Sequence, residues 1–186
     1  MLTRMEAPEL AFAIDQARQQ VRLMPDETHF DDDLTMLIGD VQSATESALR
    51  SGVTDTKYRE TLSRFPVHKW YLGRGRVQSI TSIKYFDSAN TEQTLADIKL
   101  SEFGGLVLIE PKGDRFPAVA ARLDAITVEY ISGHGAPEQV PESIKRWMKL
   151  QLGNWFTNRE SVGERALVSN PFIDGLISEY QIRTYI

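Results

Sequence analysis

Two glycines and two arginines stand together in "LGRGRVQSITSIKYFD", residues 72–87, and this stretch is the first place where the sequence could do chemistry. A glycine-rich loop binds phosphate when it follows a strand and opens a helix, and the dinucleotide fingerprint needs three glycines. Only Gly73 and Gly75 are present, and a strand-like run follows them. We interpret them as residues that let the chain turn between strands. Arg74 and Arg76 are then predicted to be exposed in the loop, as a contact with protein or a channel-facing element.

Two further stretches carry groups that could bind a cation or catalyse a reaction. The carboxylates of "FDDDL", residues 30–34, precede an apolar-periodic segment, where acidic side chains usually cap a helix and complement its dipole. His134 lies between two glycines, but neither a Ser or Cys elbow nor a second histidine stands nearby in sequence. The chain has no cysteine, which excludes disulfides, zinc-thiolate sites and thiol nucleophiles. We therefore expect no enzyme, no metal site and no cofactor.

The composition limits the class of protein. The 186 residues are 41% hydrophobic and 25% charged, which is ordinary for a globular chain with a sizeable core. A net charge of -5 argues against a protein whose main task is to grip nucleic-acid phosphates. No apolar run approaches about 18 residues, and the first ten residues lack the features of a signal peptide. We expect a protein without a membrane segment, made and kept in a cytosol-like compartment.

The spacing of apolar residues along the chain predicts the helices and strands that position these residues. Apolar residues at three- and four-residue spacing predict a helical hairpin over residues 8–21 and 30–52. Short β-type runs follow up to residue 132 and predict one small antiparallel sheet. "DSAN", residues 87–90, is predicted to be a hairpin turn because its side chains bond their own main chain.

The helical period returns after residue 140 and predicts a helix of about 18 residues. Trp147, Trp155 and Phe156 share a face of it, and we predict that they are core residues; an aromatic ligand box is the alternative. A short helix is expected over residues 171–180. The predicted fold class is α+β: a helical body, made of an N-terminal helical hairpin and a long C-terminal helix, with a small antiparallel β-subdomain inserted in the middle. The helical hairpin takes residues 1–53, the β-subdomain 54–134, and the C-terminal helices and tail 135–186.

The last ten residues, "ISEYQIRTYI", are rich in apolar and aromatic groups. Such terminal segments are often ordered only by docking on something. The segment is expected to dock either on its own subunit or on another protein. Its candidate docking residues are Ile177, Tyr180, Ile182, Tyr185 and Ile186.

The order of these segments resembles the head-to-tail adaptor, or connector, family of long-tailed bacteriophages and phage-like gene transfer particles. The resemblance covers nearly the whole chain and rests on "VQSITSIKYFD", on "ITVEYISGHG" leading through "VPESIKRWM", and on "NWFTNRES". One departure is Arg76, where such proteins often have proline. Arginine keeps the backbone donor that proline removes, which leaves the edge character of the following strand open.

The resemblance implies a single, non-enzymatic adaptor domain spanning residues 1–186, which forms a homo-oligomeric ring, commonly of twelve subunits, beneath the portal. Such a ring belongs to the virion and is assembled in the host cytoplasm. It extends the DNA channel, lets DNA pass without sequence-specific binding, and offers an attachment surface to a neck or stopper protein or a tail-completion protein. The C-terminal residues would dock on the portal protein. The acidic balance agrees, because a channel for DNA should not hold it.

Two alternatives from other classes remain open. A nucleic-acid-binding neck component would use basic residues interleaved with Tyr58, Phe65, Trp70 and Tyr71, a composition typical of single-strand binders; they are Lys57, Arg59, Arg64, Lys69, Arg74, Arg76 and Lys84. A small-molecule enzyme or binding domain would need a pocket between the sheet and the helix that carries Trp147. The sequence supplies no nucleophile, base and oxyanion site together for such an enzyme.

Overall fold

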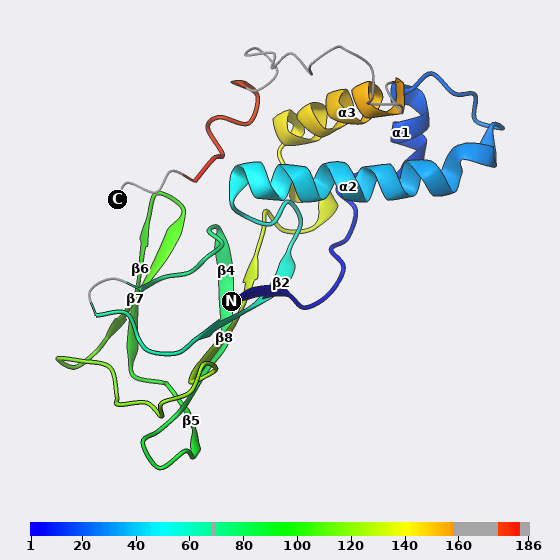
Figure 1. The fold of residues 1–186 in the computed structure, drawn as a ribbon. Coiled ribbons are helices and arrows are strands. Elements are labelled where there is room, and N and C mark those ends of the chain that lie inside the picture. Colours follow the sequence, from blue (N-terminus) through cyan, green and yellow to red (C-terminus); the bar gives the residue numbers. More distant parts are fainter. Residues whose placement is uncertain (68–69, 158–174, 183–186) are drawn as a thin grey trace, which may run out of the picture. The chain divides into compact units, whose positions relative to one another are not determined.

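The chain is mostly β in the computed structural model, which describes residues 1–67, 70–157 and 175–182 (Figure 1). Within these ranges it has three α-helices, and eight strands in two antiparallel sheets. The predicted helical body with a long C-terminal helix and one small inserted β-subdomain is therefore wrong. The error arose at short strands with few buried side chains, such as Leu2–Arg4 and Glu92–Thr94, which carry no alternating apolar pattern.

The elements follow one another along the chain with two short 3₁₀ turns between them. In order they are β1 (Leu2–Arg4), α1 (Ile14–Gln20), η1 (Thr28–Phe30), α2 (Asp31–Leu49), β2 (Thr56–Leu62), β3 (Trp70–Tyr71), β4 (Val77–Phe86), β5 (Glu92–Thr94), β6 (Ile98–Phe103), β7 (Leu106–Pro111), β8 (Ile126–Ser132), η2 (Pro137–Gln139) and α3 (Glu142–Thr157). They divide into two compact units. The β-rich unit comprises Met1–Pro8, Arg50–His134 and Ile182–Ile186, and the helical unit comprises Glu9–Leu49 and Gly135–Gln181.

The β-rich unit contains a five-stranded sheet in the order β1-β2-β8-β4-β5 and a three-stranded sheet in the order β3-β7-β6. The central strand β8 alternates strictly between buried and half-buried residues, as expected for a strand with one face on a core. Both sheets contribute to one apolar cluster, whose largest buried side chains are Tyr58, Trp70, Ile109, Ile126 and Tyr130.

The turn predicted at "DSAN" is confirmed between β4 and β5. Asp87 Oδ1 accepts hydrogen bonds from the N–H groups of Ala89 and Thr91, at 2.9 and 3.0 Å. These bonds favour the charged carboxylate and lower the pKa of Asp87. The second hairpin, β6–β7, turns at Gly104 and Gly105, which both have positive φ, as a two-residue hairpin loop requires.

In the helical unit, α2 and α3 pack against each other and both contact α1. The predicted first helix is shorter than expected because Gln42 of α2 holds the residues before it in an extended path. Its side chain accepts a hydrogen bond from Ala11 N–H at 2.9 Å and donates one to Glu9 O at 3.0 Å. The carboxylates of "FDDDL" lie in the first turn of α2, as predicted, and Asp31 also pairs with Arg18 of α1.

The aromatic side chains of α3 differ in burial. Trp147 is 8% exposed and belongs to the core, as predicted. Trp155 and Phe156 are only half-buried, and the Phe156 ring meets the edge of Phe30, 5.8 Å away between centroids. The core prediction therefore holds for Trp147 and is too strong for the other two.

This difference predicts unequal costs of truncation. Trp147→Ala should lower the free energy of unfolding by about 3 to 5 kcal/mol, because it leaves a cavity in a packed core. Trp155→Ala should cost clearly less, because water already reaches that ring. Urea unfolding of both variants, followed by circular dichroism, compares them; equal losses would show that burial on α3 is misassigned.

Candidate functional site

Of the two glycines in residues 72–87, Gly75 lies at a crossing of three backbone segments in the β-rich unit. We call Gly52, Gly75, Gly133 and Ser132 the glycine junction. A Cβ at Gly52 would lie 2.2 Å from Ser132 O, and one at Gly133 would lie 2.4 Å from Thr54 O. Real Cβ atoms do not approach backbone so closely, so each of these positions requires glycine.

Gly75 is restricted by a side chain as well as by backbone. A Cβ there would lie 2.0 Å from Ile182 Cδ1 and 2.5 Å from Gly105 O. Neither Gly73 nor Gly75 has a positive φ. The interpretation that both let the chain turn is therefore wrong for Gly75, whose missing side chain lets three segments approach one another.

Hydrogen bonds hold the junction together. The buried Ser132 hydroxyl donates to Gly75 O and accepts from Gly52 N–H at 3.2 Å. Gly75 N–H donates to Arg50 O at 3.0 Å, and Gly133 N–H donates to Arg76 O at 3.1 Å. The backbone groups brought into close contact are thus paired with one another, as buried polar groups must be.

Arg74 and Arg76 are half-buried in this structure. The Arg74 guanidinium lies 5.6 Å from the centre of the Tyr58 ring, and its backbone N–H donates to the Tyr130 hydroxyl at 3.1 Å. Burial raises the pKa of Tyr130, so that hydroxyl stays neutral. The role of both arginines as a contact or channel-facing element stays a prediction.

The backbone conformation at Arg76 excludes proline from this position. Its φ is +46°, which the proline ring cannot adopt, and its N–H donates to Gly105 O at 2.7 Å. Strand β4 begins at the next residue, so no helix N-terminus follows the loop to hold a phosphate. Strand β4 pairs with β8 along its length but with β5 only over its last three residues. Within the described sheet, its first half is therefore an edge.

His134 follows the junction and its ring is half-buried. Burial and the charge of Arg76 lower the pKa of His134 to about 4, so the imidazole is neutral at pH 7. In residues 1–67, 70–157 and 175–182, no group of three or more acidic or histidine side chains could hold a metal ion. No helix among these residues is both long and apolar enough to span a bilayer.

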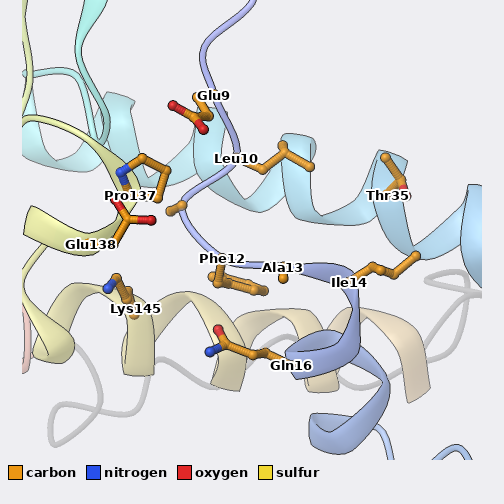
Figure 2. A pocket seen from close by; sticks show the side chains of 11 residues that line it. Glu9, Leu10, Phe12, Ala13, Ile14, Gln16, Thr35, Pro137, Glu138 and Lys145 are labelled. Atoms are coloured by element: carbon orange, nitrogen blue, oxygen red, sulfur yellow. The ribbon is translucent and has the colours of Figure 1, made fainter. Parts of the chain in front are cut away.

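A hollow of about 650 Å³ lies within the helical unit (Figure 2). Its wall is the extended segment before α1 and the start of that helix, completed by Thr35 of α2, by η2 and by Lys145 of α3. The side chains of Leu10, Phe12 and Ile14 give it an apolar lining. Charged groups are few: Glu9, Glu138 and Lys145, whose ammonium is 3.0 Å from Glu142 Oε1.

Among the described residues that line this hollow, Thr35 supplies the one hydroxyl, and there is no cysteine or histidine. The Thr35 hydroxyl donates to Asp31 O at 2.8 Å, so no lining carboxylate accepts its proton as a general base would. Its apolar lining with a few charged groups is compatible with a small molecule as well as with a side chain of another protein.

The C-terminal docking residues are only partly described. Ile177 and Ile182 are 2% and 6% exposed, and Ile182 fills the space over Gly75. Tyr180 is half-buried, and its hydroxyl lies 3.3 Å from Ser143 Oγ. Tyr185 and Ile186 lie outside the described residues. Docking on the same subunit thus accounts for the two isoleucines, and docking on the portal stays a prediction.

The nucleic-acid alternative requires exposed aromatic rings, and most of those expected are not exposed. Three of the four rings expected to stack on bases are buried, since Tyr58, Phe65 and Trp70 are 2%, 9% and 1% exposed. Of the basic residues, Lys57 and Arg59 pair with Glu129, and Lys84 pairs with Glu92. Lys69 lies outside the described residues. Among the residues that the structure describes, three of the four aromatic rings are therefore unavailable for stacking on bases.

Comparison with solved structures gives matches over the whole chain. The chain is fully covered by a protein in the neck of an empty GTA particle computed with C6 symmetry, at a TM-score of 0.84 and 19% identity, with 97% of that protein covered. It shares its fold with proteins of gene transfer agent particles. A match in the virion of a native gene transfer agent (GTA) particle also has a TM-score of 0.84, at 20% identity and with the same coverage of both chains.

A third match comes from the neck of a native GTA particle computed with C12 symmetry. It covers 100% of this chain and 97% of that protein, with a TM-score of 0.71 and 15% identity. No protein-family model matches the chain, and no curated protein sequence does. At these identities the likeness shows the fold alone.

The glycine junction predicts opposite effects for two glycine-to-alanine changes. Gly75→Ala should destabilise the protein by at least about 2 kcal/mol, because the added methyl meets backbone that cannot move aside. Gly39→Ala in α2 is the matched control. Its Cβ would meet nothing within 4 Å, so it should stabilise the helix by up to about 1 kcal/mol. Thermal unfolding of both variants measures these effects. An unchanged melting temperature for Gly75→Ala would contradict the close packing at the glycine junction.

Proposed function

We propose that this chain is a structural virion protein, a head-to-tail adaptor that forms a ring beneath the portal and extends the DNA channel. The observation that carries the proposal is the likeness to GTA neck and virion proteins, which covers the full chain at a TM-score of 0.84. Two of those structures were computed with C6 and C12 symmetry, which supports a ring of identical subunits. In this ring the chain acts without catalysis and exposes a surface to a neck, stopper or tail-completion protein.

The residues agree with this function more closely than with the alternatives. The net charge of -5 disfavours tight binding of DNA that has to pass. Three of the four rings that could stack on bases are buried, and the described residues that line the hollow in the helical unit include no cysteine or histidine. A terminal segment rich in apolar and aromatic groups is a feature of a protein that docks on another protein.

The proposal is tested by adding the purified protein to portal complexes and imaging the mixture by electron microscopy. A ring of this protein stacked on the portal is the expected result. Binding of the protein to DNA, with an affinity that falls steeply with salt, and no ring on the portal would favour the nucleic-acid alternative.

The C-terminal docking residues give a sharper prediction. Removing residues 183–186 keeps the buried Ile182 in place, so the variant should melt at the wild-type temperature. It should nevertheless lose attachment to the portal, because Tyr185 and Ile186 would fill repeated pockets there, and many weak contacts add up around a ring.

Ile182→Ala is the matched control for this truncation. It should lower the melting temperature by opening space over Gly75 while leaving the last four residues available for docking. Co-sedimentation with portal complexes compares the two variants. If the truncated protein attaches as well as the full chain, the terminal residues are not the docking element.

A further inference from the structure

The two units of the chain carry opposite net charges. The segments of the helical unit contain 15 acidic and 7 basic residues, which gives -8. Those of the β-rich unit contain 11 acidic and 14 basic residues, which gives +3. The overall charge of -5 therefore hides a strong asymmetry, and surfaces of opposite charge attract one another.

The exposed face of α2 carries part of the negative charge. Asp32, Met36 and Asp40 follow one another at four-residue spacing, so their side chains lie in one row along the helix. Both aspartates are exposed, and Met36 is 69% exposed. Among the described residues no basic side chain pairs with Asp32 or Asp40. We call this row the helix face.

The outer face of the five-stranded sheet carries positive charge. Lys57, Arg59 and Lys84 stand opposite Ile131, Glu129 and Thr127 of β8, the residues that alternate with its buried side chains. The side chains of the three basic residues are 34%, 44% and 48% exposed. Lys57 and Arg59 share one carboxylate, that of Glu129, and Lys84 pairs with Glu92, so three cations face two carboxylates and the excess charge is positive. We call Lys57, Arg59, Lys84 and Ile131 the sheet face.

We infer that the helix face of one copy binds the sheet face of a neighbouring copy. The inference rests on the proposed function, because a ring of identical subunits needs two different, complementary surfaces on each subunit. Asp32 and Asp40 would pair with the cations of the sheet face. Met36 would lie between them, against the aliphatic stems of Lys57 and Arg59 and the half-buried Ile131.

Such a contact suits ring assembly because each subunit offers one face to each neighbour. Each subunit binds one neighbour through its helix face and the other neighbour through its sheet face. Because neither face is complementary to itself, assembly does not stop at a dimer and continues until the ring closes. The charges set the partner and the register, and the exposed methionine supplies apolar contact at the centre.

Reversing the charges tests the inference. The helix variant carries Asp32→Lys and Asp40→Lys, and the sheet variant carries Lys57→Glu and Lys84→Glu. All four positions lie at the surface, so both variants should fold, which circular dichroism checks. In analytical ultracentrifugation the wild type should associate with rising concentration, and each variant alone should need at least tenfold more protein to associate.

The mixture of the two variants is the decisive sample. In the mixture, the unchanged helix face of the sheet variant can bind the unchanged sheet face of the helix variant. The two charge-reversed faces are also complementary to each other, so an equimolar mixture should associate as the wild type does. A control variant with Glu102→Lys and Asp114→Lys reverses two exposed acidic residues of the β-rich unit, outside both faces, and should associate normally. Because the chain has no cysteine, Asp40→Cys in one copy and Lys84→Cys in another should form an interchain disulfide on mixing.

The possible failures are distinguishable. If the wild type stays monomeric at low salt, or if the mixture does not regain association, the two faces do not bind each other. If the reversed variants still form rings on the portal, this inference fails while the proposed function stands. If the wild type forms no ring even on the portal, the proposed function fails as well.

Discussion

Close contact between backbone segments at the glycine junction is the constraint on which the β-rich unit depends. Gly52 and Gly133 lie where the chain enters and leaves this unit, and Gly75 lies two residues before β4. None of the three leaves room for a Cβ. The buried Ser132 hydroxyl bonds to two of them at once, so the ends of the segments that become β2, β4 and β8 are fixed at one point.

The pairing of the three central strands starts at the junction. Ser132 stands opposite both Thr56 of β2 and Val77 of β4, so the two neighbours of β8 are aligned from the same residue. From there, alternate residues of β8 enter the core while the others face outwards, because side chains alternate along a strand. The uninterrupted pairing of β2 with β8 therefore brings Tyr58 and Tyr130 into the apolar cluster and Lys57 and Arg59 to the outer face. In β4, two register shifts, between Val77 and Ser79 and between Ile80 and Ser82, leave Lys84 opposite Thr127 on the same outer face.

The sequence predicted the elements that have a strong local pattern. The acidic first turn and apolar face of α2, the core position of Trp147, the runs that form β2, β4, β7 and β8, and the turn at "DSAN" are all present. The missed strands β1, β3, β5 and β6 are short or exposed, so they carry no period that pattern analysis detects. The helix start expected near Pro8 fails because Gln42, more than thirty residues later, holds the segment extended.

The candidate site was harder to predict than the fold. The spacing of Gly73 and Gly75 suggests a turn, whereas the reason for Gly75 is contact with Gly105 and Ile182, which no local pattern reveals. The burial of Tyr58, Phe65 and Trp70 also follows from pairing between distant strands. Their interleaving with basic residues therefore resembles a nucleic-acid surface in the sequence, although these three rings are buried in the structure.

The most direct test of the account is a cryo-EM reconstruction of the neck of particles that contain this protein. The account predicts copies of this fold arranged with rotational symmetry around the DNA channel, next to the portal, with the helix face of each copy against the sheet face of its neighbour. A neck whose density contains no copy of this fold, or a single copy without contact between subunits, would contradict it.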